Sequence, residues 1–371
     1  MKKALFFFLT AMLLGSAFEA PAENLGDLRI VGSMELTHAG QFRVEYLDGG
    51  CSLISINGGG RFLLVPEGRE PPQQAGQDVV VLRQPIQNIY LAATSAMCLL
   101  NALDALERVT LSGAKAEGWY IENARAAMES GAMAYAGKYS APDYELLMAK
   151  NCGLAIESTM ICHTPEVKEK LEDLGIPVLV ERSSYEAHPL GRTEWIKLYG
   201  LLLGKEKLAG DLFREQAVYL DRIPVENTGK TVAFFYIGSS GKAVARRSGD
   251  YVTKMIELAG GNYVFTGLGD GDSAAGSVNL EMERFYSEAK NADFVIYNSS
   301  IDGEMRTMDE LLAKSHLLAG FQAVENGNVW RTSKNLFQET TEFGLMISEM
   351  HRIFTGDVDD STDLNFFDRL R

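Results

Sequence analysis

The sequence predicts an α/β protein with two similar lobes, each with a mostly parallel sheet, joined by a long central helix. Strand and helix patterns alternate from residue 88 onward, which is typical of parallel sheets covered by helices. A helical stretch over 183–223 interrupts this alternation, which returns after residue 228. Before residue 88 the pattern is β alone and predicts an antiparallel extension. A chain of 371 residues is long enough for two hydrophobic cores.

The first 22 residues have the features of a signal peptide. Lys2 and Lys3 precede an apolar run over 4–17, and Ala-Pro-Ala at 20–22 fits a cleavage site between small residues. The run is too short to cross a bilayer, and no other stretch reaches about 18 apolar residues. No cysteine follows the run, so we expect no lipid anchor. We therefore expect an exported, periplasmic protein that is not inserted into the membrane.

The N-terminal lobe is assigned to residues 28–185. It starts with four apolar runs over 28–68, separated by clusters of Gly, Asn and Asp, which predict an antiparallel β meander. One more short strand is expected at 79–82. The alternating part then follows, with strands expected at 89–92, 154–156 and 176–181 and helices at 97–106, 143–150 and 165–174.

The interlobe segment is assigned to residues 186–227. A first helix is expected to end at Gly204, because glycine suits the positive φ just past a helix end. A second helix is expected over 205–223, where apolar residues recur at three- and four-residue spacing. About 18 residues of helix span roughly 27 Å, enough to contact both lobes. The alternative is an ordinary amphipathic surface helix.

The C-terminal lobe is assigned to residues 228–355, and residues 356–371 to a polar tail. Strands are expected at 230–237, 294–297 and 328–331, and helices at 250–259, 280–290 and 343–354. The tail contains five Asp residues and is expected to be loosely held. In both lobes the expected strands end in small hydroxyl residues: Thr94-Ser95, Ser158-Thr159, Ser239-Ser240 and Ser299-Ser300. Open α/β sheets bind ligands beyond these carboxyl ends, so a cleft is expected there.

Charge and cysteine content narrow the possible partners. The net charge of −15 argues against nucleic acid and against anionic membrane surfaces. The four cysteines, Cys51, Cys98, Cys152 and Cys162, include no C-x-x-C pair. Cys152 and Cys162 flank an expected strand and would lie too far apart for a disulfide. We expect all four to be buried thiols.

Several segments in a fixed order carry a family resemblance over about 88–355. They are PDYELLMAKNCGLAIES at 142–158, LGIPVLVE at 174–181, PLGRTEWIKLYGLLLGKEKLA at 189–209, GKTVAFFYIG at 229–238 and NADFVIYNSS at 291–300. Together they resemble the substrate-binding proteins of ABC importers, in the helical-backbone class that serves ferric siderophores, haem and cobalamin. The resemblance implies two rigid lobes, a shallow cleft, little hinge motion, and an ABC permease with its ATPase as partners. The β meander departs from this family pattern.

A metal-chelate ligand would need aromatic rings and a few charged donors in the cleft. The candidates are Trp119, Tyr120, Tyr139 and Tyr185 in the first lobe and Tyr236, Arg246, Arg247, Arg306 and Lys334 in the second. Arg246 and Arg247 form a pair of guanidiniums that suits an anionic chelate. For each aromatic residue the alternative is core packing, and for the paired arginines it is a solvated turn.

Two acidic residues are candidates for contact with the permease. Glu145 and Glu283 begin corresponding helices of the two lobes. In the resembled family an acidic residue at this place in each lobe meets arginines of the permease. The alternative is that both glutamates only stabilise helix starts, where the helix dipole favours negative charge.

Other functions remain as alternatives. The ligand could be haem or cobalamin instead of a siderophore-like iron complex. An exported α/β enzyme is less favoured, because the motifs of serine hydrolases, zinc proteases and phosphate loops are absent. The glycine-rich stretch at 267–272 lacks the third glycine of dinucleotide sites and the glutamate of calcium loops. A bare-metal site is equally disfavoured: His163 and His188 follow successive expected strands and could approach, but we expect a structural role for His188 and a packed or solvated place for His351. We expect a monomer without catalysis, cofactor or resident metal.

Overall fold

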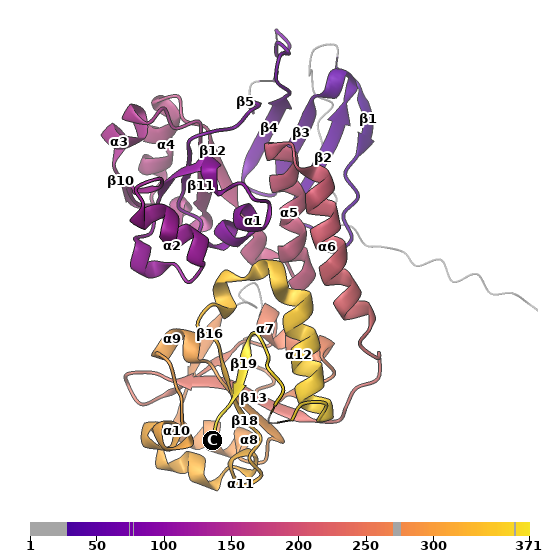
Figure 1. The fold of residues 1–371 in the computed structure, drawn as a ribbon, viewed down its shortest axis with the longest axis vertical. Helices are drawn as coiled ribbons and strands as arrows, with labels where there is room; N and C mark the ends of the chain where they lie inside the picture. Colours follow the sequence, from indigo (N-terminus) through magenta and orange to yellow (C-terminus); the bar gives the residue numbers. More distant parts are fainter. Residues whose placement is uncertain (1–27, 74, 77, 270–275, 360) are drawn as a thin grey trace, which may run out of the picture.

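Two α/β lobes lie one above the other, connected along one side by three helices (Figure 1). The computed structural model describes residues 28–73, 75–76, 78–269, 276–359 and 361–371. The connecting helices are α5 (Pro189–Leu203), α6 (Glu206–Asp221) and α12 (Phe343–Thr355). The predicted fold class is confirmed, and the predicted signal peptide lies outside the described residues. Within the part of the chain described, no helix combines the length and apolar composition needed to cross a bilayer.

The predicted N-terminal extension is a five-stranded sheet, called here the N-terminal sheet. Its strands follow in chain order: β1 (Ile30–Ser33), β2 (Phe42–Leu47), β3 (Ser52–Ile56), β4 (Gly60–Val65) and β5 (Val79–Arg83). The first four are antiparallel, as predicted, whereas β5 pairs in parallel with β4. One face joins the main core, where the Phe42 ring meets the Trp195 ring of α5 edge-on, with centroids 5.0 Å apart. The sheet is therefore docked on the interlobe helices.

The first lobe has a wholly parallel sheet in the order β12-β11-β6-β7-β8. Its strands are β6 (Ile89–Leu91), β7 (Val109–Ser112), β8 (Ala134–Tyr135), β11 (Leu154–Ser158) and β12 (Val178–Glu181). Its helices are α1 (Met97–Ala102), α2 (Glu122–Glu129), α3 (Tyr144–Ala149) and α4 (Pro165–Asp173), and β9 (Gly137–Lys138) pairs with β10 (Ala141–Pro142). The sequence analysis did not predict β7 or β8, which add two strands to one side of the sheet.

The second lobe has a mixed sheet in the order β16-β14-β13-β17-β18-β19, and β15 also pairs with β13. Its strands are β13 (Thr231–Ile237), β14 (Ala243–Arg246), β15 (Asn262–Tyr263), β16 (Ser277–Leu280), β17 (Phe294–Tyr297), β18 (Val329–Thr332) and β19 (Phe367–Arg369). The central strands β13, β17 and β18 are parallel, and the flanking pairs are antiparallel. Helices α7 (Tyr251–Leu258), α8 (Met282–Ala289), α9 (Ser299–Asp302), α10 (Met308–Lys314) and α11 (Gln322–Glu325) complete the lobe.

The prediction of a loosely held tail over 356–371 is wrong. Strand β19 pairs with β18, and Phe366, Phe367 and Leu370 are buried. The Glu349 carboxylate of α12 accepts hydrogen bonds from the backbone amides of Asn365 and Phe366. The aspartates around this segment make its composition polar, but its few apolar residues form β19, which covers the β18 edge of the second-lobe sheet.

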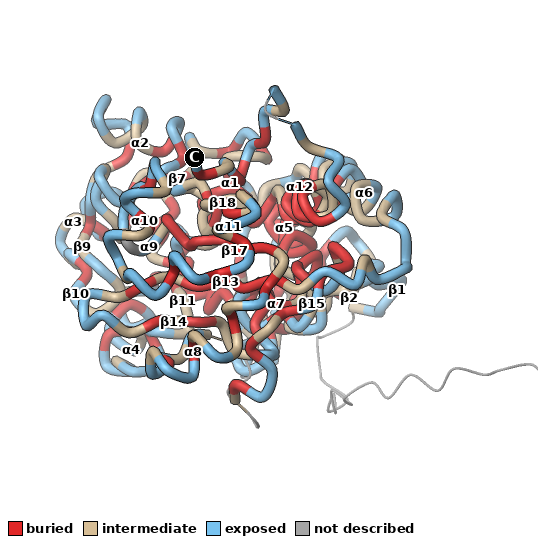
Figure 2. The backbone as a smooth tube through the Cα atoms, turned by 90° about the horizontal axis from the view of Figure 1, so that it is seen from below, coloured by how far each residue is buried: buried red, intermediate tan, exposed pale blue. Residues whose placement is uncertain are grey.

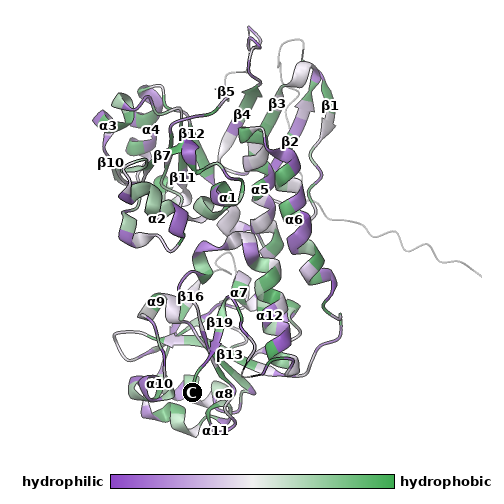
Figure 3. Cartoon of the chain, viewed as in Figure 1, coloured by the Kyte–Doolittle hydropathy of each residue, from purple (hydrophilic) through white to green (hydrophobic). Residues whose placement is uncertain are grey.

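Helix α5 is the buried centre of the molecule, more than α6. It packs against α1 of the first lobe, against α7 and α12 of the second, and against α6. Figure 2 shows α5 and α12 mostly as buried, whereas α6 is largely intermediate or exposed. Figure 3 shows mixed hydrophilic and hydrophobic segments on α6 and mostly hydrophobic ones along the central strands. Helix α5 thus contacts both lobes, whereas α6, for which this contact was predicted, packs mainly against α5 and against α12 of the second lobe.

Close packing of the interlobe helices depends on two glycines. Gly204 has φ 69° and ends α5, as its position in the sequence predicted. A Cβ at Gly200 would lie 2.5 Å from the Ala209 Cβ, so α5 and α6 touch where only a hydrogen fits.

All four cysteines are free thiols. Cys51 and Cys98 are buried and Cys152 is half-buried, in line with the prediction of packed thiols. Cys162 is exposed, which contradicts that prediction, because it lies in a surface 3-10 turn after β11.

Candidate functional site: the junction between the lobes

The lobes meet at the carboxyl ends of their parallel strands. The 3-10 turns η2 (Thr94–Ala96) and η8 (Leu336–Gln338) follow β6 and β18, and they contact each other. The loop after β7 reaches the same place. This is the edge at which open α/β sheets bind ligands, so the junction is the candidate site.

Gln338 joins the two lobes with both ends of its amide. Its Nε2 donates to the Gly118 carbonyl, and its Oε1 accepts from the Tyr120 backbone amide, each at 2.8 Å. Nearby, the Thr193 hydroxyl of α5 donates to the Thr340 carbonyl at 2.7 Å. Residues 336–342 therefore form an interlobe strap, which leads from β18 across the junction into α12. No motif in the sequence marked this strap.

Three arginines at or beside the junction each lie on an aromatic ring, and Arg182, directly after β12, also lies next to Gly58 of the N-terminal sheet. The guanidinium carbon is 3.7 Å from the ring centroid for Arg192 on Tyr251, 4.5 Å for Arg182 on Tyr185 and 4.7 Å for Arg246 on Phe337. Such stacking fixes the plane of a guanidinium and leaves its edge available for an anion. We call these three residues the junction arginines.

The donors of the junction arginines are only partly used. Arg192 Nη2 donates to the Ser184 carbonyl at 2.6 Å, and Arg246 Nη1 lies 3.7 Å from an Asp250 oxygen. Among the described residues, the Nε atoms of Arg182 and Arg192 are buried and have no hydrogen-bond partner. A buried donor without a partner costs free energy, and an anionic ligand would satisfy it.

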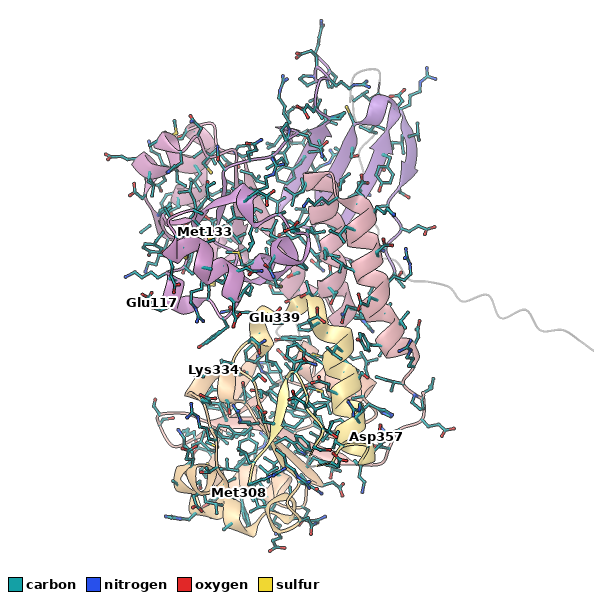
Figure 4. All side chains as sticks on the ribbon, viewed as in Figure 1. Glu117, Met133, Met308, Lys334, Glu339 and Asp357 are labelled. Atoms are coloured by element: carbon teal, nitrogen blue, oxygen red, sulfur yellow. The ribbon has the colours of Figure 1, made fainter. Side chains whose placement is uncertain are left out.

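Two carboxyl groups accompany the arginines: Glu181 is buried and Glu339 is half-buried. Glu181 accepts from the Ser95 hydroxyl at 2.9 Å and from the Ser183 amide at 2.8 Å. These hydrogen bonds and the charge of Arg192 lower the pKa of Glu181, but burial has the larger effect and raises it overall. Glu339 of the strap has its pKa raised to about 7, first by burial and then by neighbouring Glu342. Glu339 lies at the inner end of the space between the lobes (Figure 4).

Residues 95–336 match the model of a family described as periplasmic binding protein. The chain belongs to the periplasmic binding protein family. The N-terminal sheet, α12 and the C-terminal strand lie outside the matched residues.

Two curated relatives are lipoproteins of Methanocaldococcus jannaschii that are named as uncharacterised. One is 24% identical over 299 residues, which are 76% of this chain and 68% of the relative. The other is 29% identical over 171 residues, which are 44% of this chain and only 42% of the relative.

Solved structures share the fold at low sequence identity. The haem-binding protein HutB of Vibrio cholerae has a TM-score of 0.56 at 18% identity, covering 71% of this chain and 98% of that one. The periplasmic binding protein FepB of Veillonella parvula has a TM-score of 0.58 at 15% sequence identity, and the match covers 78% of this chain and 96% of that one. A protein of the Fe3+-hydroxamate transport system of Saccharomonospora viridis has a TM-score of 0.54 at 18% sequence identity, and the match covers 73% of this chain and 93% of that one.

In this periplasmic binding protein, three of the predicted ligand residues reach the junction. They are Arg246, Tyr185, which is 53% exposed under Arg182, and Tyr120, which is 39% exposed beside Gln338. Arg182 and Arg192 were not singled out in the sequence. The signal that could have found them is their position, directly after β12 and in the first turn of α5.

Three aromatic candidates do not reach the junction. Trp119 is fully buried and its Nε1 lies 3.3 Å from the Ser112 hydroxyl, so its prediction as a ligand residue is wrong. Tyr236 is half-buried within β13 and packs against the main core. Tyr139 is half-buried in the turn between β9 and β10.

Arg246 and Arg247, predicted as a pair, have different neighbours in the structure. Consecutive residues at a strand end point to opposite faces. Arg246 therefore reaches Phe337, whereas Arg247 lies against Gly269, where an added Cβ would be 2.6 Å from its Nη1.

Two further cationic candidates are engaged by Glu304 and do not join the junction arginines. Its carboxylate lies 2.8 Å from Arg306 and 3.5 Å from Lys334, and Arg331 is 3.6 Å away. Lys334 sits on the rim of the second lobe, and Glu117 sits on the facing rim of the first (Figure 4).

The two predicted docking acids are exposed and lie in corresponding places. Glu145 is in the first turn of α3 and Glu283 in the first turn of α8. Among the described residues, no group of three or more His, Cys, Asp or Glu side chains is arranged to hold a metal ion.

Proposed function

We propose that this periplasmic binding protein captures a bulky anionic metal chelate, of the ferric siderophore type, at the junction between its lobes. The observation that carries the proposal is the set of junction arginines. Each guanidinium is held flat on a ring, and two of them keep a buried, unused Nε donor. Oriented guanidiniums beside aromatic rings suit a large ligand with carboxylate or catecholate oxygens.

The proposed role is delivery, without catalysis. The ligand would pass to an inner-membrane ABC permease that works with its own ATPase, and Glu145 and Glu283 are the proposed contacts on the two lobes. Both are exposed and begin corresponding helices, which supports a pseudo-symmetric docking surface. We propose a monomer, because each lobe of a single chain carries one such contact.

We propose export by the N-terminal signal peptide to the periplasm. The curated relatives are named lipoproteins, which likewise supports a place outside the cytoplasm.

The proposed ligand class is tested by titrating one purified protein with several complexes. Ferric citrate, a ferric tris-catecholate, haemin, cyanocobalamin and free Fe3+ would each be followed by tryptophan fluorescence. The anionic ferric complexes are expected to bind more tightly than cobalamin and free iron. Tighter binding of haemin would favour the haem alternative, and equal weak binding of all probes would overturn the proposal.

A further inference from the structure

Five consecutive backbone amides of the N-terminal segment hold two carboxylates of the interlobe segment. The amides of Thr37, His38 and Ala39 donate to Glu194 at 2.7–3.0 Å, and those of Gly40 and Gln41 donate to Glu186 at 2.7 and 3.0 Å. We call residues 37–41 the amide clamp. It precedes β2 and fastens the N-terminal sheet to α5.

The clamp is tight and its charges are compensated. Glu194 is fully buried and also lies 2.7 Å from Lys197 Nζ. Glu186 also accepts from the Trp195 indole at 2.8 Å. A Cβ at Gly191 would lie 2.9 Å from the His38 carbonyl oxygen, so the clamp backbone rests directly on α5. Buried carboxylates held in this way stabilise the contact only while all their partners stay in place.

Two histidines stack at this contact. The rings of His38 and His188 are 4.0 Å apart between centroids and within 11° of parallel. His188 is also the N-cap of α5, where its Nδ1 accepts the Leu190 amide at 3.1 Å. This hydrogen bond requires an unprotonated Nδ1. A proton there would remove the cap and place positive charge at the positive end of the helix dipole.

Charged groups from three helices act on the pair. Glu194 and Lys197 come from α5, Asp221 from α6 and Lys254 from α7. Glu186, which the clamp also holds, lies just before α5. Burial is the main cause that lowers the pKa of both histidines, and that of His188 falls to about 4. The docked state therefore prefers neutral rings. Its stability is complete above the ordinary histidine pKa of 6.5 and is lost as the pH falls toward 4.

We propose that the His38–His188 stack is an acid-sensitive release point, at which protonation of either ring detaches the amide clamp from Glu186 and Glu194. The N-terminal sheet then separates from α5 while both lobes stay folded. The event needs no reactant other than a proton from the solvent. It is a regulatory property separate from ligand binding, and it does not depend on the proposed ligand.

Trp195 is a reporter at the contact itself, because its ring meets Phe42 of the sheet and its indole N–H is bonded to Glu186. The chain contains only two other tryptophans, Trp119 and Trp330. In the variant Trp119→Phe/Trp330→Phe, Trp195 is the only tryptophan left in the sequence, so the fluorescence reports only the contact between the N-terminal sheet and α5. Its emission should move to longer wavelength between about pH 6 and pH 4. The other tryptophans, followed in Trp195→Phe, should change only at lower pH.

Substitutions of the stack then test the cause. His188→Asn keeps an N-cap oxygen for α5 without a titrating ring, and His38→Phe keeps a stacked ring. The double variant with both substitutions should match the parent at pH 7.5 and expose Trp195 at a clearly lower pH, and each single variant, which keeps one titrating ring, should fall between the two. The matched control is His163→Asn, which replaces an exposed histidine; in this variant the Trp195 emission should change at the same pH as in the parent. The proposal is overturned if the stack variants also release at the parental pH, or if all three tryptophans change in one transition.

Discussion

The guanidinium of Arg192 lies on the ring of Tyr251, 3.7 Å from its centre, and so links α5 to the first turn of α7 in the second lobe. The Tyr251 ring is itself stacked on Phe343 of α12, with centroids 5.3 Å apart. The arginine is thus held against Tyr251 of α7, whose ring is in turn backed by α12, before any ligand arrives. A donor positioned in advance loses less conformational entropy when it binds.

Replacing Arg192 with Met should weaken binding of an anionic ferric chelate and leave the fold intact. Met keeps the apolar stem against Tyr251 but removes the charge. The expected loss is about 1.5–3 kcal/mol, or about 10- to 150-fold in affinity. Fluorescence titration measures it, with the exposed Arg214→Met on α6 as the control. Wild-type affinity in Arg192→Met would assign the arginine a purely structural role.

Glu157 should make the protein less stable as the pH rises. It is fully buried in β11, neither oxygen has a hydrogen-bond partner among the described residues, and burial raises its pKa from 4.5 to about 8. The folded state therefore favours the protonated form, and stability is lost between pH 4.5 and 8. Glu157→Gln should be more stable than wild type by about 2–4 kcal/mol at pH 8 and similar to it at pH 5.

Urea unfolding at the two pH values measures the effect of Glu157. The exposed Glu166→Gln at the start of α4 is the control and should show no such dependence. A constant stability difference between pH 5 and pH 8 would mean that Glu157 does not titrate in this range.

Glu194→Gln should destabilise the protein by about 2–4 kcal/mol, because an amide offers one acceptor oxygen and no charge to three backbone amides and Lys197. Burial alone would raise the pKa of Glu194, but the hydrogen bonds from Lys197 and the clamp amides outweigh it and hold the pKa below its ordinary value, so the contribution of Glu194 is present above pH 4.5 and lost in stronger acid. Denaturant unfolding at pH 7 tests this, and the exposed Glu215→Gln on α6 should be neutral. Equal stability of the two variants would show that the clamp contributes little.

A single thiol, that of Cys162, should react quickly with an aromatic disulfide reagent at pH 8. Cys162 is exposed, whereas burial raises the pKa of Cys98 to about 12 and that of Cys152 to about 11. A thiol that stays protonated and covered reacts slowly. Cys162→Ser should abolish the fast phase. A fast phase that persists in this variant would place another thiol at the surface.

Reversing both docking acids, Glu145→Arg and Glu283→Arg, should abolish uptake in cells and leave ligand affinity unchanged. Like charges would then meet across the proposed permease interface. The control is the double reversal Glu169→Arg and Glu325→Arg, which changes one exposed acid in each lobe outside the predicted docking positions. Normal uptake by the first variant would place the docking surface elsewhere.

The two lobes could be predicted from the sequence because the patterns that indicate their strands and helices lie within short stretches of chain. Alternating strands and helices, and Gly204 between two apolar helical patterns, predicted elements that the structure contains. The C-terminal strand was missed, because its few apolar residues stand among aspartates and pair only with distant β18. Local patterns carry no information about such a partner.

The site was harder to predict, because its residues are defined by contacts between lobes. Trp119 and Tyr120 are neighbours of similar character, yet one fills the core and the other lies at the junction. Gln338 has no special sequence context, and its role appears only when Gly118 is beside it. Residue type suggests chemistry, but the direction of each side chain follows from tertiary packing.

The amide clamp imposes an order on biosynthesis. Thr37 and Glu194 are separated by 157 positions, so the N-terminal sheet leaves the ribosome long before the helix that covers it. During that interval its inner face, with Phe42, Val44 and Ile54, has nothing to pack against. The apolar face of this segment therefore stays uncovered until α5 is available to pack against it.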